Sequence, residues 1–112
     1  MADRGDSAPT VRNNVGANRY ELVVHDPPAV DTVAGEKVIG EKVIGFADYR
    51  IEGDRIVFPH TVIDPAMRGR GLGSVLIEGA LRDVLPSGRT VVPQCWFVAE
   101  FLDLHPEYAH LR

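Results

Sequence analysis

A glycine-rich segment separates a β-branched apolar run from an apolar run with helical spacing. The segment is RGRGLG at residues 68–73, and it follows RIVFPHTVI at 55–63. Apolar positions recur at helical spacing from Leu72 to Val84, which predicts a strand, a loop and a helix in that order. This order offers unpaired backbone N–H groups and the positive end of a helix dipole to an anion. Glycines let the backbone approach such a ligand closely. The segment therefore predicts an anion site.

Two nucleotide-binding patterns do not match this loop. A P-loop needs Gly-Lys-Ser/Thr at its end, and no lysine follows Lys42 in the chain. A dinucleotide fingerprint needs a third glycine, but Ser74 or Leu76 stands at the required position. The hairpin-rich chain also has no second βαβ half. These patterns are therefore excluded.

The rest of the chain predicts a hairpin, further strands and a second helix. RYELVVHD at 19–26 alternates as a strand does. Residues 42–51 and 55–63 predict a hairpin, because Glu-Gly-Asp between them suits a tight turn. Residues 89–92 predict a short strand. A second helix is expected between Pro93 and Pro106, since apolar residues recur at helical spacing there.

The second arm of the hairpin carries apolar groups on both faces. In a regular strand one face would hold Ile56, Phe58, His60 and Val62, and the other would hold Val57, Pro59, Thr61 and Ile63. Such a strand is expected to be covered on both sides. Proline cannot donate a ladder hydrogen bond, so Pro59 predicts a bulge or a place where pairing is interrupted.

Two segments carry weaker signals. Residues 1–18 are polar and lack periodicity, which predicts a flexible tail before a single domain at 19–112. GEKVIGEKVIG at 35–45 is a tandem copy of five residues. Because the repeat has an odd number of residues, the two copies in one regular strand would place equivalent side chains on opposite faces. The second copy is therefore expected to be the strand, and the first a loop, bulge or hairpin extension.

Length and composition fit one small globular domain. The 112 residues carry a formal net charge of −4, which argues against a general nucleic-acid binder. No apolar run approaches the roughly 20 residues that span a bilayer, and the N-terminus lacks a signal-peptide apolar region. We therefore expect a cytoplasmic protein with no membrane partner. The single Cys95 cannot form an internal disulfide.

Several motifs resemble those of one enzyme superfamily. Arg68-x-x-Gly71-x-Gly73 resembles the acetyl-CoA loop of the GNAT N-acetyltransferases. HTVIDPAMRGRGLGSVLIEGAL, then VVPQC, then HPEYAHL resembles the small single-domain GNAT-like family of putative acetyltransferases over roughly residues 19–112. The resemblance implies an α/β fold with a mixed, mostly antiparallel sheet, splayed strands and two main helices.

The resemblance also implies a co-substrate and a site. The loop would hold the pyrophosphate of acetyl-CoA through main-chain N–H groups, and the pantetheine arm would lie where the strand before the loop separates from its parallel neighbour. The implied cofactor-binding residues are Val62, Ile63, Arg68, Gly69, Arg70, Gly71, Leu72, Gly73 and Ser74. The implied reaction transfers acetyl to an amine of unknown identity.

His60 and Cys95 are the candidate catalytic residues. His60 lies on the strand that flanks the expected cleft and Cys95 follows the neighbouring strand, so they could meet across it. One route is direct attack by the amine, with His60 as base and Cys95 near the leaving sulfur. The other is an acetyl-Cys95 intermediate, with His60 activating the thiol. Trp96 is expected in the core, and His105 and Tyr108 are expected to pack the C-terminus.

Other features of the sequence leave alternatives open. The second helix lacks the tyrosine that many GNAT enzymes use as a proton donor, and the N-terminal helical pair of larger relatives is missing. A CoA-binding module with little or no turnover is therefore the alternative function, and an interaction domain whose loop binds nothing is a further one. The four histidines and one cysteine match no structural zinc pattern, so no metal is expected. The oligomeric state is left open.

Overall fold

A computed structural model describes residues 8–33 and 36–112 of the chain. A five-stranded sheet has the order β1-β2-β3-β4-β5, with antiparallel pairs except for the parallel pair β4–β5. The expected α/β fold, with a mixed and mostly antiparallel sheet and two main helices, is confirmed. The elements are β1 (Thr10–Asn14), β2 (Arg19–Val33), β3 (Glu36–Glu52), β4 (Arg55–Ile63), α1 (Leu72–Val84), β5 (Thr90–Val92) and α2 (Trp96–Leu104).

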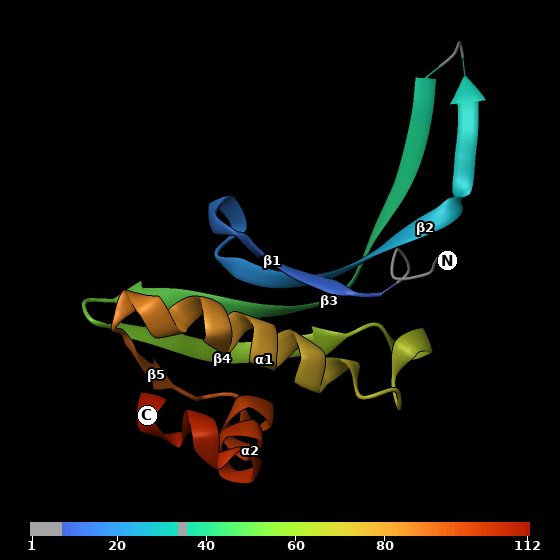
Figure 1. Cartoon of the computed structure of the whole chain (residues 1–112). Coiled ribbons are helices and arrows are strands. Elements are labelled where there is room, and N and C mark those ends of the chain that lie inside the picture. The colour runs from blue at the N-terminus through green and yellow to red at the C-terminus, as the bar shows by residue number, and fades with distance from the viewer. Residues whose placement is uncertain (1–7, 34–35) are drawn as a thin grey trace.

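The core lies between the sheet and the helices. Figure 1 shows α1 running along the sheet beside β3 and β4, with β5 and α2 next to it. The buried positions of α1 recur at helical spacing, because one stripe of a helix must face the apolar side of a sheet. Residues 106–111 form a 3₁₀ segment that adds buried Tyr108 and Leu111. The largest fully buried side chains are Phe58, Leu22, Ile44, Leu76, Ile77, Leu81, Leu102, Val23, Val57 and Val98.

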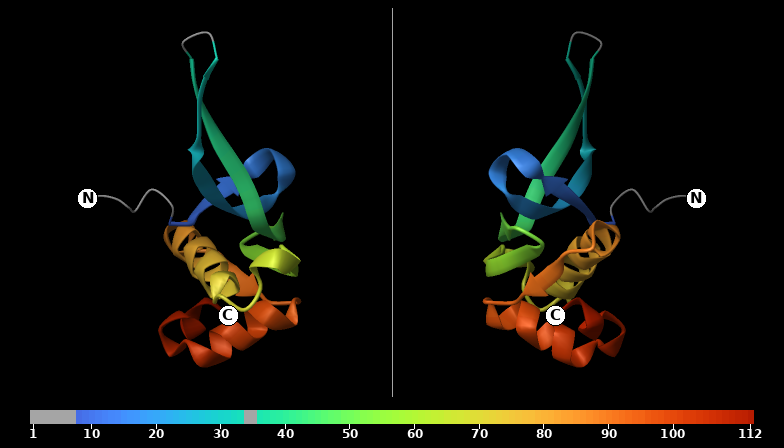
Figure 2. Two further views of the ribbon diagram at one scale, coloured as in Figure 1. Left: turned by 90° about the vertical axis from the view of Figure 1, so that its right-hand side faces the viewer. Right: turned by 90° about the vertical axis from the view of Figure 1, so that its left-hand side faces the viewer.

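β2 and β3 extend beyond the strands expected from the sequence. Both views of Figure 2 show their hairpin rising away from the helices. Residues 36–39 of the first GEKVI copy belong to β3, so this copy is a hairpin extension, while Gly35 lies outside the described residues. The ladder shifts register where Leu22 pairs with Gly45 and Val23 pairs with Val43. This bulge accommodates one extra residue, the buried Ile44.

Residues 10–17 differ from the flexible tail expected over residues 1–18. Thr10–Asn14 form β1, which pairs antiparallel with the start of β2, and Val15–Ala17 form a 3₁₀ turn. The prediction is wrong over these residues, because pairing an edge strand uses main-chain groups and needs no apolar side-chain pattern. Residues 1–7 lie outside the described residues.

β4 carries the bulge that Pro59 predicts. Asp48 pairs with His60 and Arg50 pairs with Val57, so two residues of β4 oppose one residue of β3. Before the bulge, Ile56 and Phe58 face the core; after it, Thr61 stands opposite the buried core residue Ala47. Directly opposite residues share a face of the sheet, so odd-numbered positions now face the helices. The expected grouping of His60 and Val62 with Phe58 is therefore wrong.

Candidate functional site

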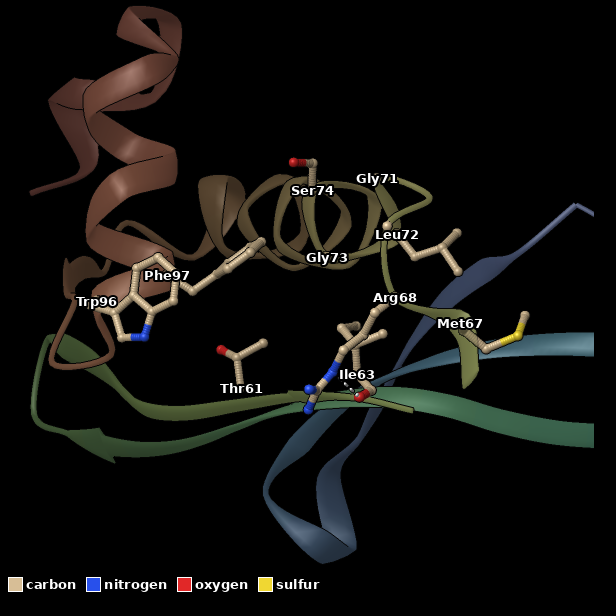
Figure 3. Close-up of a pocket in the computed structure, with 11 residues that line it drawn as sticks. Thr61, Ile63, Met67, Arg68, Gly71, Leu72, Gly73, Ser74, Trp96 and Phe97 are labelled. Carbon is tan, nitrogen blue, oxygen red and sulfur yellow. Dashed lines mark hydrogen bonds between the residues drawn. The ribbon is translucent and has the colours of Figure 1, made fainter. Parts of the chain in front are cut away.

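A cavity of about 530 Å³ lies between the end of β4, the glycine loop and the starts of both helices. Figure 3 shows Met67, Arg68 and Leu72 at one end of this cavity and Thr61, Trp96 and Phe97 at the other. The lining is mixed, with an apolar wall and several backbone groups, as small-molecule sites usually are. The lining residues are Thr61, Ile63, Met67, Arg68, Gly69, Gly71, Leu72, Gly73, Ser74, Trp96 and Phe97.

The glycines of the loop serve two different needs. Gly69 and Gly71 have φ values of 83° and 72°, and a Cβ atom at either position would meet no atom within 4 Å. Glycine is therefore required at these two positions because of the left-handed backbone, and not because a side chain would clash with a neighbour. Gly73 has ordinary helical φ, but a Cβ there would overlap the ring of Phe97. Gly73 therefore allows the close packing of α1 against the start of α2.

The first turn of α1 borders the cavity with its backbone donors. The first hydrogen bond of this turn runs from the N–H of Val75 to the carbonyl oxygen of Gly71, at 3.4 Å. Leu72, Gly73 and Ser74 precede it, and their N–H groups find no acceptor in the described part of the chain. These donors and the helix dipole, equivalent to about half a positive charge, favour an anion at this end of the cavity.

The two arginines of the loop differ in position. Arg68 reaches over the end of the cavity and donates from Nε to the carbonyl oxygen of Ile63 at 3.4 Å (Figure 3). Arg70 is exposed and is absent from the lining. Both can add positive charge near a bound anion, but only Arg68 contacts the strand.

β4 and β5 separate beside the cavity. They pair only from Arg55 to Val57, and one further hydrogen bond joins the N–H of Cys95 to the carbonyl oxygen of Phe58 at 2.8 Å. Beyond that bond, the ladder between these strands ends. This parting of parallel strands is the splayed arrangement expected from the sequence.

The end of β4 has backbone groups directed into this opening. The N–H of Asp64 donates to the carbonyl oxygen of Ile44 at 2.8 Å. In an antiparallel pair, every second residue of a strand hydrogen-bonds to its partner strand, and at this end of β4 these are the even-numbered residues, in phase with Asp64. The N–H and C=O groups of Thr61 and Ile63 therefore point away from β3. Val62, which was expected to bind the cofactor, faces the other side of the sheet and uses its backbone to pair with Phe46.

The structure does not bring His60 and Cys95 together. His60 is exposed on the face opposite the cavity, where its ring centroid lies 6.1 Å from that of Phe46. Cys95 stands at the N-cap of α2, half-buried, with Sγ 3.5 Å from Oγ1 of Thr61. The expected meeting across the cleft fails, because the bulge at Pro59 reverses the faces of the strand after it.

Thr61 and Trp96 are site residues that the sequence interpretation missed. Thr61 was assigned to the wrong face, and the proline that predicts the bulge was the available signal. Trp96 was expected in the core, yet 72% of it is exposed and it packs edge-on against Phe97 beside the cavity. No sequence signal marked this exposure, since apolar residues usually lie inside.

The C-terminal motif has a packing role, as expected. The ring of His105 stacks on Phe101 at 3.9 Å between centroids. The hydroxyl of buried Tyr108 donates to Glu78 at 3.1 Å and accepts from Arg82 at 3.2 Å. α2 itself contains no tyrosine. Tyr108, which follows α2, is already hydrogen-bonded to side chains of α1.

The described part of the chain forms neither a metal-ligand cluster nor a helix that could span a membrane. Within residues 8–33 and 36–112, no three or more His, Cys, Asp or Glu residues gather in a way that could hold a metal ion. No helix in this same part of the chain is long and apolar enough to cross a membrane.

The glycine loop before α1, the parted strands and the cavity between them define an α/β domain with a candidate binding site for an anionic ligand. A family model described as GCN5-related N-acetyl-transferase matches residues 35–111, which is well over half of the chain. The chain belongs to this family. A comparison with curated proteins returned no match.

Proposed function

We propose that this protein transfers the acetyl group of acetyl-CoA to an amine. The observation that carries this proposal is the cavity of about 530 Å³, which joins unpartnered helix N–H groups at one end to the free backbone edge of β4 along its side. Acetyl-CoA has an anionic pyrophosphate followed by a long arm with amide groups. The two parts of the cavity offer complementary groups to these two parts of the molecule.

The pyrophosphate would lie at the first turn of α1. The N–H groups of Leu72, Gly73 and Ser74 would donate to it, and Arg68 would add charge from the loop. Arg70 would contribute only by its charge. The left-handed conformations of Gly69 and Gly71 keep the loop backbone close to this position.

The pantetheine arm would lie along the end of β4. Its amides would pair with the outward N–H and C=O groups of Thr61 and Ile63, as an added strand pairs with a sheet edge. The arm would displace the weak contact of Arg68 with Ile63. Its sulfur would then lie near Thr61, Cys95 and Trp96, at the far end of the cavity.

The acceptor amine would approach from the face that carries His60. Asp48 is the cross-strand partner of His60, and Asp64 follows β4 beside an open hollow on this face. Carboxylates attract an ammonium group, and His60 could take the proton that the amine must lose. Because His60 and Cys95 lie on opposite faces, this arrangement favours direct attack over an acetyl-Cys95 intermediate activated by His60.

A CoA-binding module with little turnover is the second candidate. The observation that favours it is the engagement of Tyr108, which leaves no free tyrosine on or next to α2 for protonation of the leaving thiolate. This module would bind acetyl-CoA at the same loop and strand, and it would differ only in lacking transfer to an amine.

Binding and transfer can be measured separately. Acetyl-CoA at a hundred times its Kd should stabilise the protein by about 2.7 kcal/mol, which a thermal shift detects. The Gly71→Glu variant, with a strained backbone and a negative charge at the loop, should lose this shift. Absence of a shift at millimolar acetyl-CoA for the unaltered protein would contradict both candidate functions.

A panel of amines then separates the two functions. Release of free CoA that depends on an amine supports the transferase, whereas binding without release on any amine supports the module. Intact-mass measurement after incubation with acetyl-CoA tests the covalent route, which requires one added acetyl group that Cys95→Ser abolishes. Direct attack predicts no such addition.

A further inference from the structure

Thr61 occupies the end of the cavity farthest from the glycine loop. Its side chain points from β4 toward α1, and Figure 3 shows it on the same side as Trp96 and Phe97. Its Oγ1 lies 3.5 Å from Sγ of Cys95, within the distance of a hydrogen bond donated by a thiol. This contact uses the acceptor capacity of the hydroxyl and leaves its proton free for another partner.

Acyl transfer from a thioester releases a thiolate, which needs a proton. In the proposed reaction His60 lies on the opposite face, and Tyr108 is engaged by Glu78 and Arg82. Among the lining residues, Ser74 carries the other aliphatic hydroxyl, but it belongs to the first turn of α1, where the pyrophosphate would lie. Thr61 is therefore the lining hydroxyl at the end where the sulfur would arrive.

We infer that Thr61 relays a proton from Cys95 to the sulfur of the leaving CoA. This inference rests on the proposed function, which it deepens by assigning the missing proton donor. The hydroxyl of Thr61 gives its proton to the sulfur while Oγ1 takes the proton of the Cys95 thiol. Transfer from one thiol to another through a hydroxyl costs little, because donor and final acceptor are chemically alike.

The step balances in atoms and charge. The amine nitrogen bonds to the acetyl carbonyl carbon, the C–S bond breaks, and its electron pair leaves with the CoA sulfur. The proton lost by the amine goes to His60, which releases it to water after the step. Thr61 ends the step protonated as it began, and Cys95 ends as a thiolate that regains a proton from water. No oxidant, metal or further co-reactant is required.

The bulge at Pro59 makes this relay possible. Without the extra residue in β4, Thr61 would face away from the core and His60 would face the cavity. The hydrogen bond from the N–H of Cys95 to the carbonyl oxygen of Phe58 holds the start of α2 beside the bulge. Thr61 is thus positioned by the pairing of β4 with β3, and Cys95 by its backbone hydrogen bond to β4.

Thr61→Val, which keeps the shape of the side chain and removes the hydroxyl, is the central test. Its kcat for CoA release should fall about a hundredfold, at the low end of general acid–base effects, while the Kd for acetyl-CoA stays within about twofold. Thr61→Ser should recover most of the lost kcat. Thr90→Val, on an exposed β5 position outside the cavity, is the matched control and should change neither value.

A double substitution tests whether the two side chains act as one unit. Cys95→Ala should lower kcat. The double variant Thr61→Val with Cys95→Ala should have the same kcat as Thr61→Val alone, because loss of either residue already interrupts the proton transfer. Losses that multiply in the double variant would show independent roles and would overturn the relay.

Alkylation of Cys95 provides a readout that does not depend on activity. S-methyl-CoA, whose sulfur is capped and does not consume the reagent, should slow the reaction of Cys95 with iodoacetamide in both the unaltered protein and Thr61→Val, because its arm covers that end of the cavity. ADP, which has the pyrophosphate but lacks the arm, should not. If S-methyl-CoA binds without slowing alkylation, the sulfur lies elsewhere and the inference is wrong.

The outcomes separate this inference from the proposed function. No binding of acetyl-CoA, or binding without turnover on any amine, contradicts the transferase and the relay together. Turnover that Thr61→Val leaves unchanged contradicts the relay alone, and the transferase assignment stands.

Discussion

At the first turn of α1, Leu72, Gly73 and Ser74 present backbone N–H groups beside a cavity, whereas side-chain hydrogen bonds hold the second half of the helix. There the hydroxyl of Tyr20 donates to Asp83 at 2.7 Å, and burial raises the pKa of Tyr20. Glu78 and Arg82 both contact Tyr108. The N-terminal end of α1 thus has backbone N–H groups without partners, which suits a ligand. Side chains at its C-terminal end are hydrogen-bonded, which stabilises the fold.

The difference between the two ends of α1 shows where a protein can keep polar groups without hydrogen-bond partners. Unpaired polar groups cost free energy when buried, so they persist where a ligand or water reaches them. The middle of α1 is buried against the sheet and keeps the two ends in fixed positions. Substitutions at the two ends should therefore have separable effects on stability and on binding.

The largest effect on stability is expected from Leu81→Ala. Leu81 is fully buried in the satisfied half of α1, and removal of its side chain leaves a cavity. The free energy of unfolding in urea should fall by about 2–5 kcal/mol, while the Kd for acetyl-CoA of the folded protein stays unchanged. Val75→Ala, at an exposed position of the same helix, should cost about 0.5 kcal/mol or less. A loss below about 1 kcal/mol in Leu81→Ala would contradict the core assignment.

Gly71 and Gly88 allow a matched test of the two ends. Gly88 follows the 3₁₀ turn that continues α1, and its φ of 75° is close to the 72° of Gly71. A Cβ atom at either position meets no neighbour. Alanine should therefore cost about 1–2 kcal/mol of stability at each position. Only Gly71→Ala should weaken acetyl-CoA binding in calorimetry, and equal affinities in the two variants would mean that the loop conformation does not matter for the ligand.

Tyr108→Phe should have a smaller effect. It removes the hydroxyl that bonds to Glu78 and Arg82 and keeps the buried ring. We expect a loss of about 0.5–1.5 kcal/mol in the free energy of unfolding. CoA release should continue at the rate of the unaltered protein. A large fall in kcat would instead mean that Tyr108 supplies the proton and would favour it over Thr61.

Glu21→Gln should give the smallest effect, and one that depends on pH. Burial alone would raise the pKa of Glu21, but hydrogen bonds from Asn14, Arg19 and Arg12 outweigh it and hold this pKa below the ordinary 4.5. The ionised carboxylate therefore adds stability above pH 4.5, and this stability is lost as the pH falls through the lowered pKa. The variant should be less stable than the unaltered protein at pH 7, and the gap in unfolding free energy should close in acid. A gap that stays constant down to pH 3 would show that the charge of Glu21 has no role.

Local patterns in the sequence predicted the elements that depend on neighbouring residues. The hairpin at 42–63 followed from alternation and from Glu52-Gly53-Asp54, and α1 followed from helical spacing after the glycine loop. Pro59 predicted the bulge. The pairing of β1 had no such signal, because an edge strand can form through its main chain alone.

The candidate site was predictable only in part. Positive φ at Gly69 and Gly71 agrees with what a tight ligand loop needs, but Gly73 serves to pack against Phe97, which lies in a distant part of the sequence. The exposure of Trp96 likewise depends on how α2 sits against α1. Neither property can be read from local spacing.

The sequence by itself determined the order of strand, loop and helix, and it marked Pro59 as a break in β4. The tertiary structure alone decided what that break does. Side chains alternate along a strand, so one extra residue exchanges the faces of all positions after it. That exchange moves His60 away from Cys95 and brings Thr61 to it. Which of these side chains faces the cavity depends on the register with β3, and register is fixed by contacts across the sheet.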